Sequence, residues 1–221
     1  MWKVLPCAVT ADVRESRQVE DRAELQRVLN ATLEEANAVF ADVLLAPFRI
    51  TVGDEWQGLL QDVAPAFAVV RFFRKALYPY GARYGVGEGQ LTTALSRDVT
   101  QMDGPVFHRS REALRLAKEN GRWLVFRTRE ARTDALLSSV AGLIEALMSR
   151  WTPNQRERFF LLEKLGSQKA VAQHLGVSVS AVNQSLRAAG VGQLRECEEA
   201  LDSFLRAWGD GSLAAGLLKN L

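Results

Sequence analysis

The chain has 221 residues, of which 48% are hydrophobic and 24% are charged, and its formal net charge is +2 at pH 7. This length and composition are typical of a globular protein with one large domain or two small ones, and we expect two. No stretch of the sequence approaches the roughly 18 uninterrupted apolar residues that a membrane-spanning helix needs. This excludes the class of proteins with such helices. With no secretory signal pattern either, we expect a cytoplasmic protein that has no membrane partner.

The N-terminal part alternates strand patterns with helix patterns. Apolar, β-prone runs predict strands, and apolar positions at helical spacing predict helices. The predicted elements are a strand (residues 4–10), a helix (21–40), a hairpin (48–60), a helix (65–78), a strand (83–88) continued by residues 91–95, a helix (107–120) and a strand (123–127). The first six, in the order βαββαβ, are typical of a ferredoxin-like split βαβ fold.

Two acidic residues fall where this topology brings strand ends together. The first and second strands run parallel in it, so Asp12 and Asp54 should meet at one edge of the sheet, with Glu55 beside them. Hard oxygen ligands suit Mg²⁺ or Mn²⁺, and such an edge can hold a metal-bound nucleotide, with Arg17 or Arg83 binding its phosphates. The simpler alternative is that Asp54 only caps the hairpin turn.

Three stretches resemble the palm-like catalytic domain of nucleotidyl cyclases, diguanylate cyclases above all. Residues 53–56 (GDEW) resemble the GGDEF hairpin, residues 84–87 (YGVG) the strand behind it, and residues 113–122 (ALRLAKENGR) the terminal helix. Val52 stands where the cyclase hairpin has its first glycine, and its Cβ removes the close backbone approach that glycine permits. The resemblance therefore implies metal-dependent nucleotide or phosphate binding rather than cyclase turnover.

The chain resembles the bacterial SatD family still more closely, and this likeness covers nearly its whole length. The residues that carry it are Asp12, Ser16-Arg17, residues 51–59 (TVGDEWQGL), residues 83–89 (RYGVGEG) and residues 103–105 (DGP).

The C-terminal third carries the capping pattern of three short helices. After a connecting helix (133–150), Thr152 and Pro153 are suited to begin one helix, Ser167 a second (168–175) and Ser178 a third (179–188). Ala172 precedes Gly176 by four residues, where a small side chain lets the last two helices cross closely. Residues 151–190 resemble the helix-turn-helix of sigma-factor region 4, and another amphipathic helix follows residue 192.

The helix-turn-helix pattern assigns one face to DNA. Residues 150–195 contain seven basic residues and two acidic ones, a local excess of positive charge that suits a nucleic acid. Amides and guanidinium groups on the outer side of the third helix can read base edges, and neighbouring polar groups can hold the phosphate backbone. The predicted base-reading residues are Ser180, Ala181, Asn183, Gln184 and Arg187. The predicted backbone contacts are Lys169, Gln173 and Ser178.

We therefore predict an α+β chain with a ferredoxin-like, palm-type domain (residues 1–132), a connecting helix (133–150) and an all-α helix-turn-helix domain (151–221). The predicted function is a homodimeric regulator of transcription that binds double-stranded DNA, with a nucleotide and Mg²⁺ or Mn²⁺ as effector. Two alternatives stay open. One is a metal-dependent nucleotidyl transferase or phosphohydrolase, and the other is a protein-binding adaptor.

Overall fold

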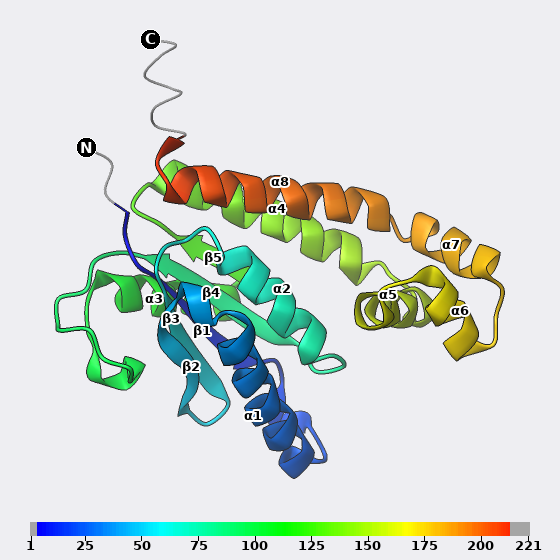
Figure 1. Cartoon of the computed structure of the whole chain (residues 1–221), viewed down its shortest axis with the longest axis horizontal. Helices are drawn as coiled ribbons and strands as arrows, with labels where there is room; N and C mark the ends of the chain where they lie inside the picture. Colours follow the sequence, from blue (N-terminus) through cyan, green and yellow to red (C-terminus); the bar gives the residue numbers. More distant parts are fainter. Residues whose placement is uncertain (1–3, 213–221) are drawn as a thin grey trace, which may run out of the picture.

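The computed structural model describes residues 4–212. Its N-terminal part alternates strands and helices, and its C-terminal part is helical (Figure 1). The N-terminal elements are β1 (Cys7–Val13), η1 (Ser16–Gln18), α1 (Arg22–Val39), η2 (Ala41–Val43), β2 (Leu44–Val52), β3 (Glu55–Leu60), α2 (Ala66–Ala76), β4 (Ala82–Glu88), η3 (Val99–Gln101), α3 (Pro105–Glu119) and β5 (Leu124–Arg127). The C-terminal elements are α4 (Ala131–Ser149), α5 (Pro153–Leu165), α6 (Gln168–Leu175), α7 (Val179–Ala188) and α8 (Val191–Gly209). Among these, no helix has the length and apolar character needed to span a bilayer.

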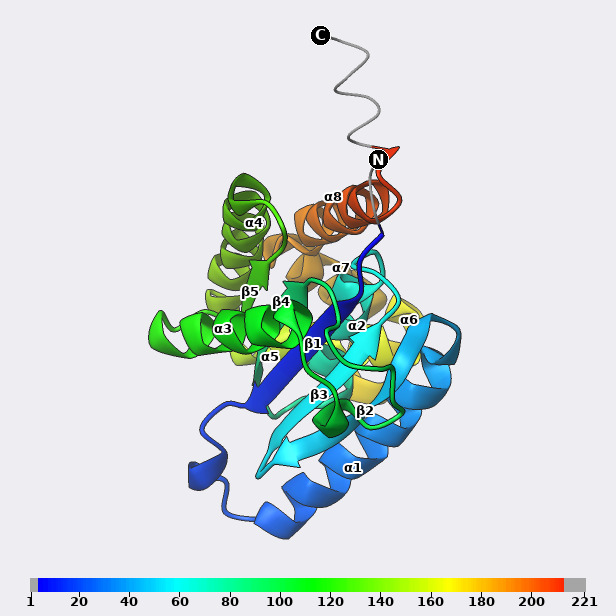
Figure 2. The same cartoon turned by 90° about the vertical axis from the view of Figure 1, so that its left-hand side faces the viewer.

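The strands form one sheet in the order β2-β3-β1-β4-β5. β1 pairs antiparallel with β3 and β4, β2 pairs antiparallel with β3, and β5 adds to β4 in parallel. β1 and β2 therefore run in the same direction, and the ferredoxin-like βαββαβ order is confirmed. Helices α1 and α2 cover one face of the sheet and α3 covers the other (Figure 2).

The period-two alternation of β1 divides its side chains between two layers. Every second residue from Cys7 to Val13 belongs to the main core under α1 and α2, together with Trp56 and Phe73. Thr10 points to the opposite side, where its hydroxyl lies 2.8 Å from the Ser110 hydroxyl of α3. Asp12, two residues after Thr10, therefore also lies on the α3 face.

α3 lies directly on the backbone of β4. A Cβ atom at Gly85 would overlap the Ser110 carbonyl oxygen and the Leu114 amide nitrogen, and one at Gly87 would overlap the Ser110 amide. These glycines permit an approach that no other residue allows. The YGVG segment thus fixes α3 against the sheet.

Two expectations for the sheet are wrong. Residues 91–95 do not continue it, because β5 occupies the free edge of β4 and the chain instead crosses to the start of α3, with the Thr92 amide bonded to the Asp103 carbonyl at 2.9 Å. β2 begins at Leu44, earlier than expected, and its pairing with β3 contains irregularities that interrupt the apolar alternation.

The C-terminal helices begin and end where the capping pattern predicts. The Thr152 and Gln155 side chains form a reciprocal capping box, and the Ser167 and Ser178 hydroxyls cap α6 and α7. α5, α6 and α7 pack against one another, and α8 runs beside α4 (Figure 1). One continuous core extends from the sheet into these helices. The boundaries at residues 132 and 150 stay a prediction.

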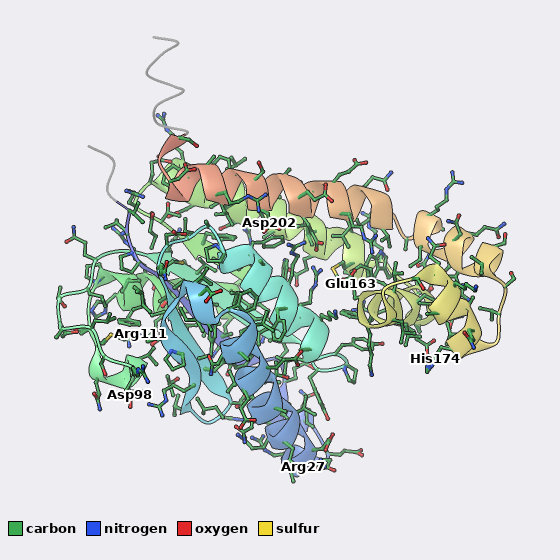
Figure 3. The ribbon with its side chains drawn as sticks, in the orientation of Figure 1. Arg27, Asp98, Arg111, Glu163, His174 and Asp202 are labelled. Carbon is green, nitrogen blue, oxygen red and sulfur yellow. The ribbon has the colours of Figure 1, made fainter. Side chains whose placement is uncertain are left out.

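A group of buried charges attaches α8 to α2. Glu198 accepts a hydrogen bond from Arg74 at 2.7 Å. Asp202, which Figure 3 labels on α8, pairs with Arg71. The Arg74 guanidinium also lies over the Trp123 ring, 5.4 Å from its centroid. These contacts tie the last helix to the N-terminal sheet layer through charge as well as apolar packing.

Candidate functional site

At the predicted acidic edge, the residue directly opposite Asp12 is Glu55 and not Asp54. In the sheet register Asp12 stands opposite Glu55 of β3 on one side and opposite Arg83 of β4 on the other. Directly opposed residues of antiparallel strands have their side chains on one face, so all three face α3. The structure thus brings together three residues that are far apart in sequence.

A lysine from α3 completes this group. The Lys118 ammonium lies 2.8 Å from Asp12 Oδ2 and 3.8 Å from Glu55 Oε2. Burial raises the pKa of Glu55 above its ordinary value, Lys118 opposes that rise, and the Asp12 carboxylate adds to it. Two carboxylates that would repel each other are held at one edge because a cation lies against both.

The remaining predicted ligands are arranged differently. Asp54 lies in the two-residue loop of the β2–β3 hairpin after Gly53, which has a positive φ of 61°, and its buried Oδ2 has no hydrogen-bond partner in the described chain. Arg17 is exposed on η1. Arg83 is half-buried, and its Nε finds no partner among residues 4–212.

The donor set at this edge fits a hard cation only in part. Two carboxylates and an unpartnered buried oxygen on Asp54 suit Mg²⁺ or Mn²⁺. In the part of the chain that the structure describes, however, no three His, Cys, Asp or Glu side chains form a metal-binding group. Lys118 supplies the positive charge there, so a metal ion would have to displace its ammonium from Asp12.

A small hollow beside this edge is basic. It measures about 220 Å³ and is lined by Glu55, Leu114 and three basic residues of α3. Those three residues are Arg111, Arg115 and Lys118. Arg115 is paired with Glu112 and Glu119, at 2.7 and 2.5 Å, whereas Arg111 lies 3.9 Å from Asp103. Of these three residues Arg111 has the longest ion pair, so its guanidinium is the best placed to bind a phosphate.

The predicted DNA-binding residues belong to α6, to α7 and to the Ser178 cap of α7. Val182 and Leu186 of α7 are buried, and the residues between them face outward or lie at the margin. Lys169, Gln173, Ser178, Ser180, Gln184 and Arg187 are exposed, and Ala181 and Asn183 are half-buried. All eight residues therefore retain at least partial access to a partner.

Three of these residues already make contacts within the protein. The Ser178 hydroxyl accepts the Ala181 amide at 3.1 Å, which caps α7. Asn183 donates to the Gln168 side chain at 3.2 Å, and Arg158 donates to the Ala181 carbonyl at 3.3 Å. Among the eight, Lys169, Gln173, Ser180, Gln184 and Arg187 are exposed and make no side-chain hydrogen bond or ion pair within residues 4–212.

A model of the SatD family matches residues 7–203 of the chain. The chain belongs to the SatD family. The resemblance seen in its hairpin and its glycine-rich strand is thereby confirmed. No curated protein matches this SatD-family chain at a significant level.

Several solved structures share features with this SatD-family protein. A bacterial light-regulated adenylyl cyclase is 10% identical over 56% of this chain and 75% of that chain, with a TM-score of 0.40. A microbial GGDEF domain, studied with cyclic di-GMP, is 19% identical over 55% and 79%, with a TM-score of 0.39. A regulator of polyketide synthase expression from Bifidobacterium adolescentis is 14% identical over 92% and 86%, with a TM-score of 0.25. Since these scores are below 0.5, the fold assignment rests on the strand order.

Sequence reasoning missed three residues of these sites in the SatD-family protein. Lys118 and Arg111 lie seven positions apart, and this helical spacing could have indicated that both side chains share one side of α3. The basic stretch that contains them looks like an ordinary solvated helix. Gln168 had no signal, because its contact with Asn183 depends on how α6 crosses α7.

Proposed function

We propose that this SatD-family protein is a DNA-binding regulator of transcription whose recognition helix is α7. The observation that carries the proposal is the division of α7 into a buried side, Val182 and Leu186, and an exposed polar side that includes Gln184 and Arg187. Amide and guanidinium groups are the donors that pair with adenine and guanine in the major groove. Lys169 and Gln173 on α6 would hold the phosphate backbone.

We further propose that two copies bind one site, because a helix-turn-helix reads paired half-sites through a two-fold dimer. Leu136 and Leu143 of α4 are 51% and 69% exposed. The other exposed residues between Arg132 and Ser149 are small and uncharged, namely Ala135, Ser139 and Ala146. This face of α4 is suited to a second copy of the chain.

Arg187→Ala should weaken binding to double-stranded DNA by about 1–3 kcal/mol, which is roughly 5- to 150-fold, because it removes a charge-assisted contact. The measurement is fluorescence anisotropy with duplexes selected from a random pool on the native protein, at several salt concentrations. Arg206→Ala is the matched control, since Arg206 is also exposed but lies on α8. A native protein whose DNA binding is absent, or insensitive to salt, would instead be the protein-binding adaptor.

The acidic edge supports a second role, as the effector site for a nucleotide with Mg²⁺ or Mn²⁺. The supporting observation is the cluster of Asp12, Glu55 and Lys118 beside a basic hollow, with the unpartnered Asp54 oxygen near the same strand end. Arg83 and Arg17 stay candidates for the phosphates, with Arg111 added. Chemically, the bound metal would neutralise the phosphate charge, while these side chains orient the nucleotide.

Nucleoside triphosphates with Mn²⁺ should raise the unfolding temperature of the native protein, because ligands that bind only the folded state stabilise it. An Asp12→Ala/Asp54→Ala double variant should lose this shift. Glu34→Ala/Glu199→Ala, which removes two exposed carboxylates elsewhere, should keep it. Product analysis of the same mixtures then separates the regulator from a nucleotidyl transferase or phosphohydrolase, which would release a new nucleotide. The absence of a shift with every nucleotide rules out this role for the edge.

A further inference from the structure

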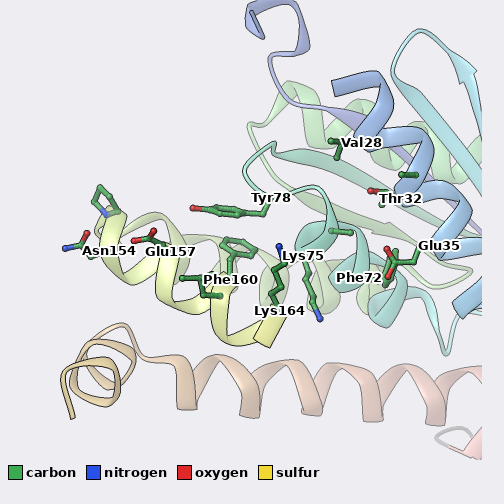
Figure 4. Close-up of a pocket in the computed structure, with 14 residues that line it drawn as sticks. Val28, Thr32, Glu35, Phe72, Lys75, Tyr78, Asn154, Glu157, Phe160 and Lys164 are labelled. Atoms are coloured by element: carbon green, nitrogen blue, oxygen red, sulfur yellow. The ribbon is translucent and has the colours of Figure 1, made fainter. Parts of the chain in front are cut away.

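One large cavity of the described chain lies away from the acidic edge. It measures about 910 Å³ and opens between α1 and α2 on one side and α5 on the other (Figure 4). Ligand pockets in proteins commonly measure about 300–1,000 Å³ and have apolar walls with a few polar groups. This cavity has that size, and it lies where the N-terminal layer meets the helices assigned to DNA.

Aromatic side chains form one part of the wall. Tyr78, just after α2, stacks on Phe160 of α5 with ring centroids 4.0 Å apart and planes inclined by 16°. Phe72 of α2 and Val28 of α1 add apolar surface. Phe160 is nearly buried while Tyr78 is 37% exposed, so the stack forms a flat edge that a planar ligand can extend.

Two lysines line the same cavity from opposite walls. Lys75 belongs to α2 and Lys164 to α5, and neither has a hydrogen bond or ion pair within residues 4–212. Glu157 and Glu35 lie toward the two ends, with the lysines between them in the close-up (Figure 4). Both lysines are exposed and have no ion pair in the described chain, so each ammonium group can turn toward an anion bound in the cavity.

We propose that this cavity binds a small aromatic anion, a flat ring system that carries one negatively charged group. The charged group pairs with Lys75 and Lys164, and the ring lies against Phe72 and Phe160. Because the walls come from α1, α2 and α5, the bound molecule fixes α5 relative to the sheet layer. It thereby changes the affinity of the α6–α7 surface for DNA. Only this last coupling rests on the proposed function, and the binding itself does not.

The probe is 8-anilinonaphthalene-1-sulfonate, an aromatic sulfonate whose fluorescence rises in apolar surroundings. We expect saturable binding of one molecule per native chain, weakened at least tenfold in a Lys75→Gln/Lys164→Gln double variant. Arg132→Gln/Arg206→Gln removes two exposed charges outside the cavity and should bind as the native protein does. If the lysine double variant binds the probe with unchanged affinity, the proposed anion site is wrong.

Two further measurements keep the test decisive if the double variant folds poorly. Glu35→Gln should tighten probe binding several-fold, because it removes a repelling charge from the wall, and equal or weaker binding counts against the site. 1-Naphthoate and 1-naphthyl phosphate compare a carboxylate with a phosphate on the same ring, and each should displace the probe at lower concentration than neutral 1-naphthalenemethanol. If 1-naphthalenemethanol displaces the probe as well as the two anions do, the cavity does not select a negatively charged ligand.

The coupling is measured separately by DNA affinity at saturating 1-naphthoate. A change of about fivefold or more supports it, which is the usual lower range of allosteric coupling. Equal DNA affinity with and without the ligand overturns the coupling while leaving the site in place. If the native protein binds no DNA at all, the proposed function is wrong. The probe titration still shows by itself whether the cavity binds an aromatic anion.

Discussion

Replacing Gly85 with valine (Gly85→Val) should lower the free energy of unfolding by more than about 3 kcal/mol, or prevent folding altogether. The added side chain would meet the Ser110 carbonyl and the Leu114 amide of α3. Both are backbone atoms inside a helix, so neither can rotate away, and α3 would have to leave the sheet. Urea unfolding followed by circular dichroism measures the change.

Gly142→Ala is the matched control for this prediction. Gly142 lies within α4, and a Cβ built on it meets no atom within 4 Å. Alanine should stabilise the helix by about 0.5–1 kcal/mol, because glycine loses more backbone entropy on folding. Equal effects at positions 85 and 142 would contradict the direct packing of α3 on β4.

Glu198→Ala should destabilise the protein by about 3–5 kcal/mol, because it leaves an arginine charge buried without its partner. Glu198 is only 5% exposed and bonds Arg74 at 2.7 Å, with Arg71 3.7 Å away. The arginines would keep the desolvation cost and lose the compensating carboxylate. Chemical unfolding gives the magnitude.

Glu199→Ala separates this effect from a general loss of charge on α8. Glu199 is exposed on the same helix, and its removal should change the stability by less than about 0.5 kcal/mol. A Glu198→Leu/Arg74→Met double variant should recover much of the lost stability, since well-packed apolar residues can replace a buried ion pair. If Glu198→Ala unfolds at the native urea concentration, α8 is not held by this group.

Local chemistry explains which parts of the fold could be predicted from the sequence. The helices around Thr152, Ser167 and Ser178 begin at their capping residues, because a hydroxyl satisfies amides only a few positions away. Strand order predicted that Asp12 would meet the hairpin acids, but it favoured Asp54, whereas the sheet register places Glu55 opposite Asp12. Residues 91–95 were misassigned because their apolar content matched a strand, whereas the sheet edge they needed was already occupied by β5.

Long-range contacts explain what could not be predicted. Lys118 reaches Asp12 only because Gly85 and Gly87 let α3 approach β4 so closely. The cavity between α1, α2 and α5 depends on how the C-terminal helices are placed, and no periodicity in the sequence encodes that placement. Arg71 and Arg74 looked like ordinary charges at the end of a helix until α8 was found beside them.

α8 is one uninterrupted helix of 19 residues, so it is about 28 Å long. Its far end is anchored in the sheet layer, where the Trp208 indole donates to the Glu88 carboxylate at 3.3 Å, and its near end follows α7 directly after Gly190. The buried Glu198–Arg74 pair also holds α8 about 10 Å from its near end, so a tilt of about 10° around Glu198 would carry that end through only about 2 Å. This displacement is smaller than the step of about 3.4 Å between neighbouring base pairs. If α7 binds DNA as proposed, α8 would therefore keep the recognition helix in one register along the groove.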